Sequence, residues 1–296
     1  MKAKNRPGTT PEDRIRILLP AEYQERYEDI QPVSMGSAGL KFGADGRVGW
    51  DEMWRSFCDL AMAGGPPHRG ALLEPGLESE ISAEPARYRE VVEEICRGIR
   101  MVTELAVSPS LNPGWVSVGC DSATMANWLA RAITMENVSA WFEDSVLELP
   151  AGPGFRIEKE IKNVITSLAK TNHYFADHLR RGQQQEIEAL FAEMDAEAPL
   201  VQAASFGHGF SAERDPVLRD AIAVLVQAKP SAPEYAGWVG VALADQRSAI
   251  RGMRLLGTVN VVARRESSVL YLPVNPLVDP DGNLVASAVR RILANQ

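Results

Sequence analysis

The chain has few of the features from which a sequence usually reveals its function. Its 296 residues include only Cys58, Cys96 and Cys120, and an odd number of widely spaced cysteines disfavours a disulfide framework. No apolar run approaches the roughly 18 residues of a membrane-spanning helix, and no apolar segment follows the charged N-terminus as it does in a secretory leader. We therefore expect a cytoplasmic protein that does not bind a membrane.

An excess of positive charge is also missing. The chain carries 31 basic and 39 acidic residues, a net charge of −8, which argues against a nucleic acid as its main partner. The patterns typical of zinc proteases, nucleotide phosphate loops and serine hydrolases do not occur. The sequence predicts no metal site, leaves the cofactor unknown and fixes no reaction.

An internal repeat is the strongest positive signal. Gly114–Pro150 aligns without a gap onto Gly237–Pro273 at an offset of 123 residues, with 15 identities in 37 positions. A repeat of this length indicates a duplicated folding unit rather than a short solenoid period. Residues kept in both copies, such as Trp115 and Trp238, are expected to be structural.

The order of apolar segments extends this repeat into a fold. We predict an α/β protein with two tandem β-α-β-α-β-β-α units that form a pseudo-two-fold, two-lobed sandwich, preceded by an N-terminal hairpin-helix extension. The expected parts are the extension (1–63), the first unit (64–180), a bridging helix (181–198) and the second unit (199–296). The predicted cleft lies where the two units meet.

Local signals set the expected elements. Asp45-Gly46 predicts a hairpin turn, and Asn137 stands where a helix ends in the left-handed backbone region. Strands are expected at 71–74, 114–118, 200–206 and 237–241, helices at 85–107, 155–178, 215–227 and 284–293, and hairpins at 138–149 and 261–272.

The two copies differ at one strand end and in one hairpin. Cys120 and Asp121 of the first copy align with Leu243 and Ala244 of the second. They lie where a predicted strand ends and a helix begins, the edge at which α/β sheets bind ligands. Cys120 would be activated by the helix N-terminus and Asp121 would act as a base, or both are structural, Cys120 as a buried residue and Asp121 as a helix cap. Arg264-Arg265 replaces Trp141-Phe142, as an anion-binding pair or as a solvated edge strand.

The most unusual local sequence is the loop Gly64–Gly70, which reads GGPPHRG. Gly64 and Gly65 would let the backbone approach a ligand, His68 would move protons, and Arg69 would hold an anion. Glu74 is expected to lie near the same edge. The alternative is a rigid connection that binds nothing.

His208 lies between two glycines, where a predicted strand leaves the sheet, and this position suits acid–base chemistry or metal binding. The stretch GHGFSAERDP is similar to the histidine loop of class II tetrapyrrole metal chelatases, which are also two-lobed α/β proteins. That resemblance implies metal binding or chelatase-like chemistry through His208. His173 and His178 are five residues apart, which is poor spacing for two ligands on one α-helical face.

These observations lead us to expect an enzyme that acts on a small anionic metabolite in the inter-lobe cleft by general acid–base chemistry. Arg69 would hold the anion, with Gly64, Gly65, Glu74 and Cys120 beside it, and His208, His68 and Asp121 would transfer or orient protons. Two alternatives remain open. One is a non-enzymatic assembly protein that forms a homodimer, and the other is the chelatase-like protein that uses His208.

Overall fold

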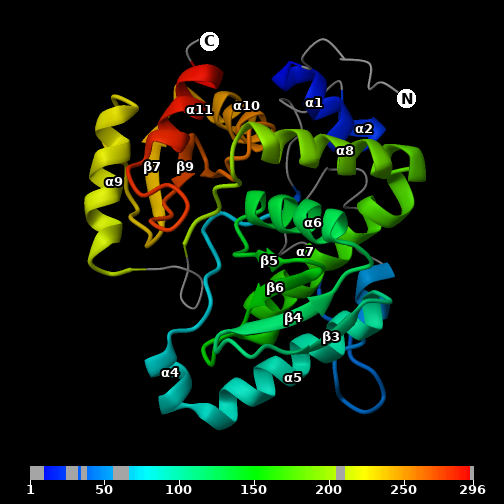
Figure 1. Cartoon of the computed structure of the whole chain (residues 1–296). Coiled ribbons are helices and arrows are strands. Elements are labelled where there is room, and N and C mark those ends of the chain that lie inside the picture. Colours follow the sequence, from blue (N-terminus) through cyan, green and yellow to red (C-terminus); the bar gives the residue numbers. More distant parts are fainter. Residues whose placement is uncertain (1–9, 25–32, 35–38, 56–66, 205–210, 294–296) are drawn as a thin grey trace.

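The computed structural model describes residues 10–24, 33–34, 39–55, 67–204 and 211–293 (Figure 1). It has mixed helices and strands with two small antiparallel sheets, consistent with the expected α/β class. The N-terminal part contains α1 (Pro11–Leu18), α2 (Ala21–Gln24) and the two-residue strand β1 (Val33–Ser34), which pairs in parallel with β2 (Pro67–His68). The expected turn before residue 47 forms and is closed by a bridge between Phe42 and Val48.

The first sheet has the order β3-β4-β6-β5 and is antiparallel throughout. Its surroundings are helical, and in Figure 1 the helix α5 lies along β3 and β4. The elements are α4 (Glu78–Ala83), α5 (Pro85–Val102), β3 (Ala106–Pro109), β4 (Trp115–Gly119), α6 (Ala123–Met135), β5 (Trp141–Glu143), β6 (Val146–Pro150), η1 (Ile157–Ile161), α7 (Lys162–His173) and η2 (Tyr174–His178). The η elements are π-helical turns.

The second sheet has the order β7-β9-β8 and is also antiparallel. The expected bridging helix is present as α8 (Arg181–Glu197), which contacts both α1 and α6 (Figure 1). The remaining elements are α9 (Arg214–Leu225), β7 (Trp238–Ala242), α10 (Gln246–Gly257), β8 (Arg264–Glu266), β9 (Val269–Pro273) and α11 (Asn283–Leu293).

Several turns follow the local chemistry of the sequence. Asn137 and Asn260 adopt φ of 63° and 59° after α6 and α10, as expected for the residue that ends a helix in the left-handed region. The cap of α6 is Ser122, whose side chain accepts from the Met125 N–H. Asp121 is therefore not the cap, and Asp245, at the position equivalent to Ser122, caps α10.

Three expected elements differ in the structure. The helix predicted over 85–107 ends at Val102, because Thr103 turns to an extended conformation and Ala106 begins the edge strand β3. The strand expected at 71–74 reduces to a parallel bridge between Leu73 and Val138, and the strand at 200–206 to one between Val201 and Val261. Residues 205–206 lie outside the described part of the chain.

Buried apolar side chains form two main clusters, one for each sheet and its helices. Burial of apolar area is the dominant favourable term in folding, so each sheet has its own source of stability. The segment 69–77 runs between the two sheets (Figure 1), and the third, smaller cluster of Leu72, Trp238 and Tyr271 joins it to β7 and β9. This junction positions the candidate site.

Candidate functional site

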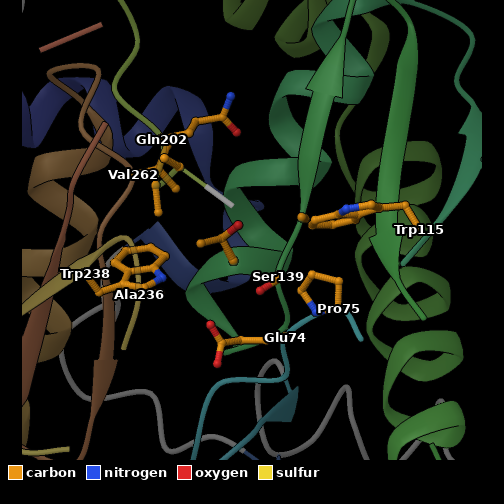
Figure 2. Close-up of a pocket in the computed structure, with 12 residues that line it drawn as sticks. Glu74, Pro75, Trp115, Ser139, Gln202, Ala236, Trp238 and Val262 are labelled. Atoms are coloured by element: carbon orange, nitrogen blue, oxygen red, sulfur yellow. The ribbon is translucent and has the colours of Figure 1, made fainter. Parts of the chain in front are cut away.

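A pocket opens between the two sheets, at the segment that separates them (Figure 2). Its volume is about 30 Å³, which holds roughly two or three water molecules, and it opens to solvent. The lining residues are Glu74, Pro75, Trp115, Thr134, Ser139, Ala140, Gln202, Ala203, Ala204, Ala236, Trp238 and Val262.

The two sides of the pocket come from the first strand residue of β4 in one sheet and of β7 in the other, and from two residues that each follow a bridge. Trp115 and Trp238 are the first residues of β4 and β7 and stand on opposite sides in Figure 2. Glu74 follows the Leu73 bridge to Val138, and Gln202 follows the Val201 bridge to Val261. The backbone is therefore similar on both sides of the pocket, but one side carries the carboxylate of Glu74 and the other the amide of Gln202.

Among the described residues, Glu74 is the only charged one that lines this pocket. Its side chain keeps access to solvent, but the surrounding protein removes enough water to raise the pKa of its carboxyl group above 4.5. Arg264 opposes this rise and Glu266 adds to it. The Glu74 carboxyl group therefore takes up a proton more readily than an ordinary glutamate, which is a property of acid–base groups.

Thr134 contributes a polar group to the same pocket. Thr134 is only 5% exposed, and its hydroxyl oxygen is buried with no hydrogen-bond partner among the described residues. A buried hydroxyl without a partner costs free energy unless water or a ligand satisfies it. The Thr134 hydroxyl is therefore an unsatisfied buried group in the pocket wall.

The guanidinium group of Arg264 packs against Trp238 and two other aromatic rings. Its guanidinium carbon lies 4.4 Å from the Tyr235 ring centroid, 4.9 Å from that of Trp238 and 4.1 Å from that of Tyr271. One of its nitrogens donates to Glu266 Oε1 over 2.7 Å, and the same oxygen accepts from the Leu72 N–H over 3.2 Å. This buried group ties the segment 69–77 to β8 and holds the pocket wall in place.

The expectation for Arg264 and Arg265 as exposed or solvated arginines is wrong. The two residues are 0% and 3% exposed, and burial lowers the pKa of both guanidinium groups, that of Arg265 to about 10. Arg264 is covered by three aromatic rings, that of Tyr271, its cross-strand partner in the same hairpin, and those of Tyr235 and Trp238 from outside the hairpin. Trp141 and Phe142, at the matching positions of the first unit, are half-buried.

Arg69 lies at the other end of the segment. Its N–H donates to the Glu136 carbonyl, and its own carbonyl accepts from Asn137 Nδ2 over 2.7 Å. The side-chain nitrogens Nε and Nη1 are buried without a partner among the described residues. Burial lowers the pKa of this guanidinium, which Glu160 and Glu266 partly offset. Arg69 does not line the pocket.

Cys120 and Asp121 are not at this site. Cys120 follows the last residue of β4, whereas the pocket lies at Trp115, the first, so about five residues or roughly 16 Å separate them. Burial, with Asp121 adding to it, raises the pKa of the Cys120 thiol to about 12, so the thiol is not activated. Asp121 is exposed.

The remaining predicted residues are not placed. Gly64, Gly65 and His208 lie outside the described residues. The backbone of His68 forms part of β2, which contacts α7, but its side chain is outside the description. Their proposed roles stay predictions.

Sequence reasoning missed the pocket walls. Trp115 and Trp238 were interpreted as core because both copies keep them, and Thr134 and Gln202 carry no recognisable motif. The two tryptophans are indeed buried, at 1% and 5% exposure, yet each also lines the pocket. Their presence in both copies was the one available signal.

A buried acid lies next to Arg69, whose N–H donates to its carbonyl oxygen. Glu136 ends α6, is 4% exposed, and burial raises the pKa of its carboxyl group well above 4.5 against the opposing effects of Lys170, Ser167 and Arg254. The folded state therefore keeps a proton that the unfolded state loses, and this group reduces stability as the pH rises above 4.5.

Replacing Glu136 with glutamine should flatten that dependence. Urea unfolding from pH 5 to 8 should show the wild type losing up to about 1.4 kcal/mol more per pH unit than Glu136→Gln, until the folded carboxyl ionises. The exposed Glu84→Gln serves as the control and should follow the wild type. Parallel curves for wild type and Glu136→Gln would contradict the raised pKa.

Within the described residues, no group of three or more His, Cys, Asp or Glu side chains is arranged to hold a metal ion. Nor is any helix in the described part long and apolar enough to cross a membrane. Comparisons with protein-family models, curated proteins and solved structures find no match for this chain. Its function must therefore be argued from the geometry of the pocket.

Proposed function

We propose that the protein is an enzyme that binds a small anionic metabolite between its two sheets and transfers a proton through Glu74. The observation that carries this proposal is the Glu74 carboxyl, whose pKa is raised in a recess that it shares with the buried, unpartnered hydroxyl of Thr134. Perturbed titratable groups in recesses are characteristic of acid–base catalysts.

The anionic part of the substrate is assigned to Arg69. A buried guanidinium with two nitrogens unpartnered among the described residues is an unsatisfied donor, and carboxylates and phosphates are its natural acceptors. Glu74 and Arg69 belong to one segment, and both interact electrostatically with Glu266. In this proposal the substrate extends along the segment, with its reacting end in the pocket and its anionic end toward Arg69.

We further propose that the two halves are copies of one unit related by a pseudo-two-fold axis through the pocket. The strands β4, β5 and β6 recur as β7, β8 and β9 at the offset of the sequence repeat. Positive φ recurs at the same offset in the pairs Gly114 and Gly237, and Asn137 and Asn260. A duplicated scaffold with Glu74 on one side of the pocket and Gln202 on the other would give one working site from two similar halves.

The assembly alternative predicts a broad apolar surface. The large apolar side chains that are most exposed in the described residues are spread over several parts of the chain, among them Phe42 at the N-terminal turn, Leu111 between β3 and β4, the pair Val217 and Val224 on α9, and Leu277 before α11. In Figure 1, α9 and β3 lie on opposite sides of the molecule. This distribution gives the assembly proposal less support than the pocket gives the enzyme.

The test is a ligand screen of the full chain by thermal shift, with carboxylated and phosphorylated metabolites. A ligand at 100 times its dissociation constant adds about 2.7 kcal/mol to the stability of the native state. Glu74→Gln should retain binding but lose turnover of that ligand, because the amide keeps the shape of the carboxyl group and cannot transfer the proton. Arg69→Gln should weaken binding by about tenfold or more.

The matched control is the exposed Glu84→Gln, which should leave binding and turnover unchanged. Full turnover in Glu74→Gln would overturn the assignment of the acid–base group. If no metabolite shifts the melting temperature of the wild type, the binding proposal itself fails.

A further inference from the structure

A pair of histidines lies outside the pocket, at the end of α7. The Nε2 atoms of His173 and His178 are 3.3 Å apart, and the two rings meet at an interplanar angle of 74°. His173 Nδ1 lies 2.6 Å from Asp177 Oδ2. None of these residues takes part in the function proposed above.

The π-helical turn η2 brings the two histidines together. In an α-helix, five residues advance about 500°, which leaves the two side chains roughly 140° apart. In η2 the Leu179 N–H donates to the Tyr174 carbonyl five residues earlier, so the turn is wider than in an α-helix and five residues advance the chain by little more than one turn. The spacing that argues against a shared face in an α-helix therefore becomes the correct spacing here.

Asp177 determines which nitrogen of His173 is available. Because Nδ1 lies 2.6 Å from a carboxylate oxygen, it is the ring nitrogen that bears the hydrogen and donates the hydrogen bond to Asp177. The other nitrogen of the neutral ring, Nε2, therefore keeps its lone pair. A carboxylate that accepts from the far nitrogen of an imidazole is the usual support of a metal-binding histidine. It fixes the orientation of the ring and makes the ligating nitrogen more basic.

The distance between the two Nε2 atoms fits a shared ion. With Zn–N bonds of about 2.0–2.1 Å and tetrahedral geometry, two ligating nitrogens lie about 3.3–3.4 Å apart. The observed separation is 3.3 Å. The His173 side chain is 27% exposed, so an ion can reach it from solvent and complete its coordination with water.

We propose that His173 and His178 form a two-histidine site for a divalent transition metal such as Zn²⁺, Ni²⁺ or Cu²⁺, with Asp177 as the residue that positions His173. Imidazole is a suitable ligand for all three ions. The site should bind Cu²⁺ more tightly than either Ni²⁺ or Zn²⁺. The ion would join the end of α7 to η2 across the π-helical turn.

The experiment is calorimetric titration of the full chain with Ni²⁺, Cu²⁺ or Zn²⁺ in a non-chelating buffer, together with electron paramagnetic resonance of the Cu²⁺ form. We expect one strong site per chain and hyperfine coupling to two nitrogens. His178→Gln should weaken binding by about tenfold or more, and Asp177→Asn by about 10–100-fold. Circular dichroism without metal should match the wild type for both variants, since Asp177 is exposed and His178 half-buried.

The other two histidines of the chain provide the control. The double variant His68→Gln and His208→Gln should keep the site and its two-nitrogen signal. Unchanged uptake in His178→Gln, uptake lost only in the double variant, or no uptake by the wild type would each overturn the proposal and leave a hydrogen bond between the imidazoles. Because neither residue lines the pocket, the outcome is independent of the proposed function.

Discussion

Replacing Arg264 with methionine should lower the free energy of unfolding by about 3–5 kcal/mol, because it removes one partner of a buried ion pair. The Arg264 side chain is fully buried, and Glu266 is 11% exposed. Without Arg264, the Glu266 carboxylate loses its ion pair, and three aromatic rings lose the cation against which they pack. Urea denaturation at pH 7 measures the change.

Two further variants separate the charge from the packing. Glu266→Gln added to Arg264→Met removes the unpaired charge and should recover part of the loss, whereas a loss due only to packing would not recover. Arg55→Met, at the exposed end of an ion pair with a 3.9 Å contact to Asp51, should cost less than about 1 kcal/mol. If Arg264→Met remains within 1 kcal/mol of the wild type, the buried group does not support the pocket wall.

The secondary structure that depends on local chemistry could be predicted from the sequence. The left-handed turns at Asn137 and Asn260, the bridging helix α8 and both hairpins appear where the residue pattern places them. Each depends on neighbours within a few residues, so the signal lies in the sequence itself. The edge strand β3 was missed because the apolar spacing of α5 continues past its end at Val102.

The features that depend on distant contacts could not be predicted. Besides Tyr271, its cross-strand partner, Arg264 is covered by Tyr235 and Trp238, which lie outside the hairpin, and nothing in the hairpin sequence shows that these two rings cover it. The histidine pair depends on a π-helical turn, which residue spacing does not reveal. In both cases the local sequence favours the simpler interpretation, an exposed arginine or two histidines on different faces.

The position of the pocket also departs from the expectation, for a topological reason. In open parallel sheets, ligands bind at the carboxyl ends of the strands, and this rule predicts a site at Cys120 and Asp121. Both sheets are antiparallel, so the rule does not apply. The pocket instead lies at the first residues of β4 and β7, where the segment around Glu74 passes between the sheets. Glu74 lines this pocket, and its role as a site residue stays a prediction.

Gly237→Ala should be among the most damaging small substitutions in the chain. Gly237 has φ of +75°, and a Cβ atom there would lie 2.3 Å from the carbonyl oxygen of Ala204, a backbone atom that cannot rotate away. The strain of positive φ costs about 1–2 kcal/mol and the clash about 1–3 kcal/mol, so we expect a loss of about 2–5 kcal/mol in thermal or urea unfolding. Because Ala204 lines the pocket, ligand binding should weaken as well.

The corresponding glycine of the first unit is the matched control. Gly114 has φ of +91°, but a Cβ atom there would lie 3.0 Å from the nearest atom, the Gly76 carbonyl oxygen. Gly114→Ala therefore has similar backbone strain with a weaker clash, and it should cost less than Gly237→Ala. Equal losses would mean that backbone conformation alone sets the cost. A larger loss at Gly114 would contradict the closer approach of the second unit to its segment at Ala204.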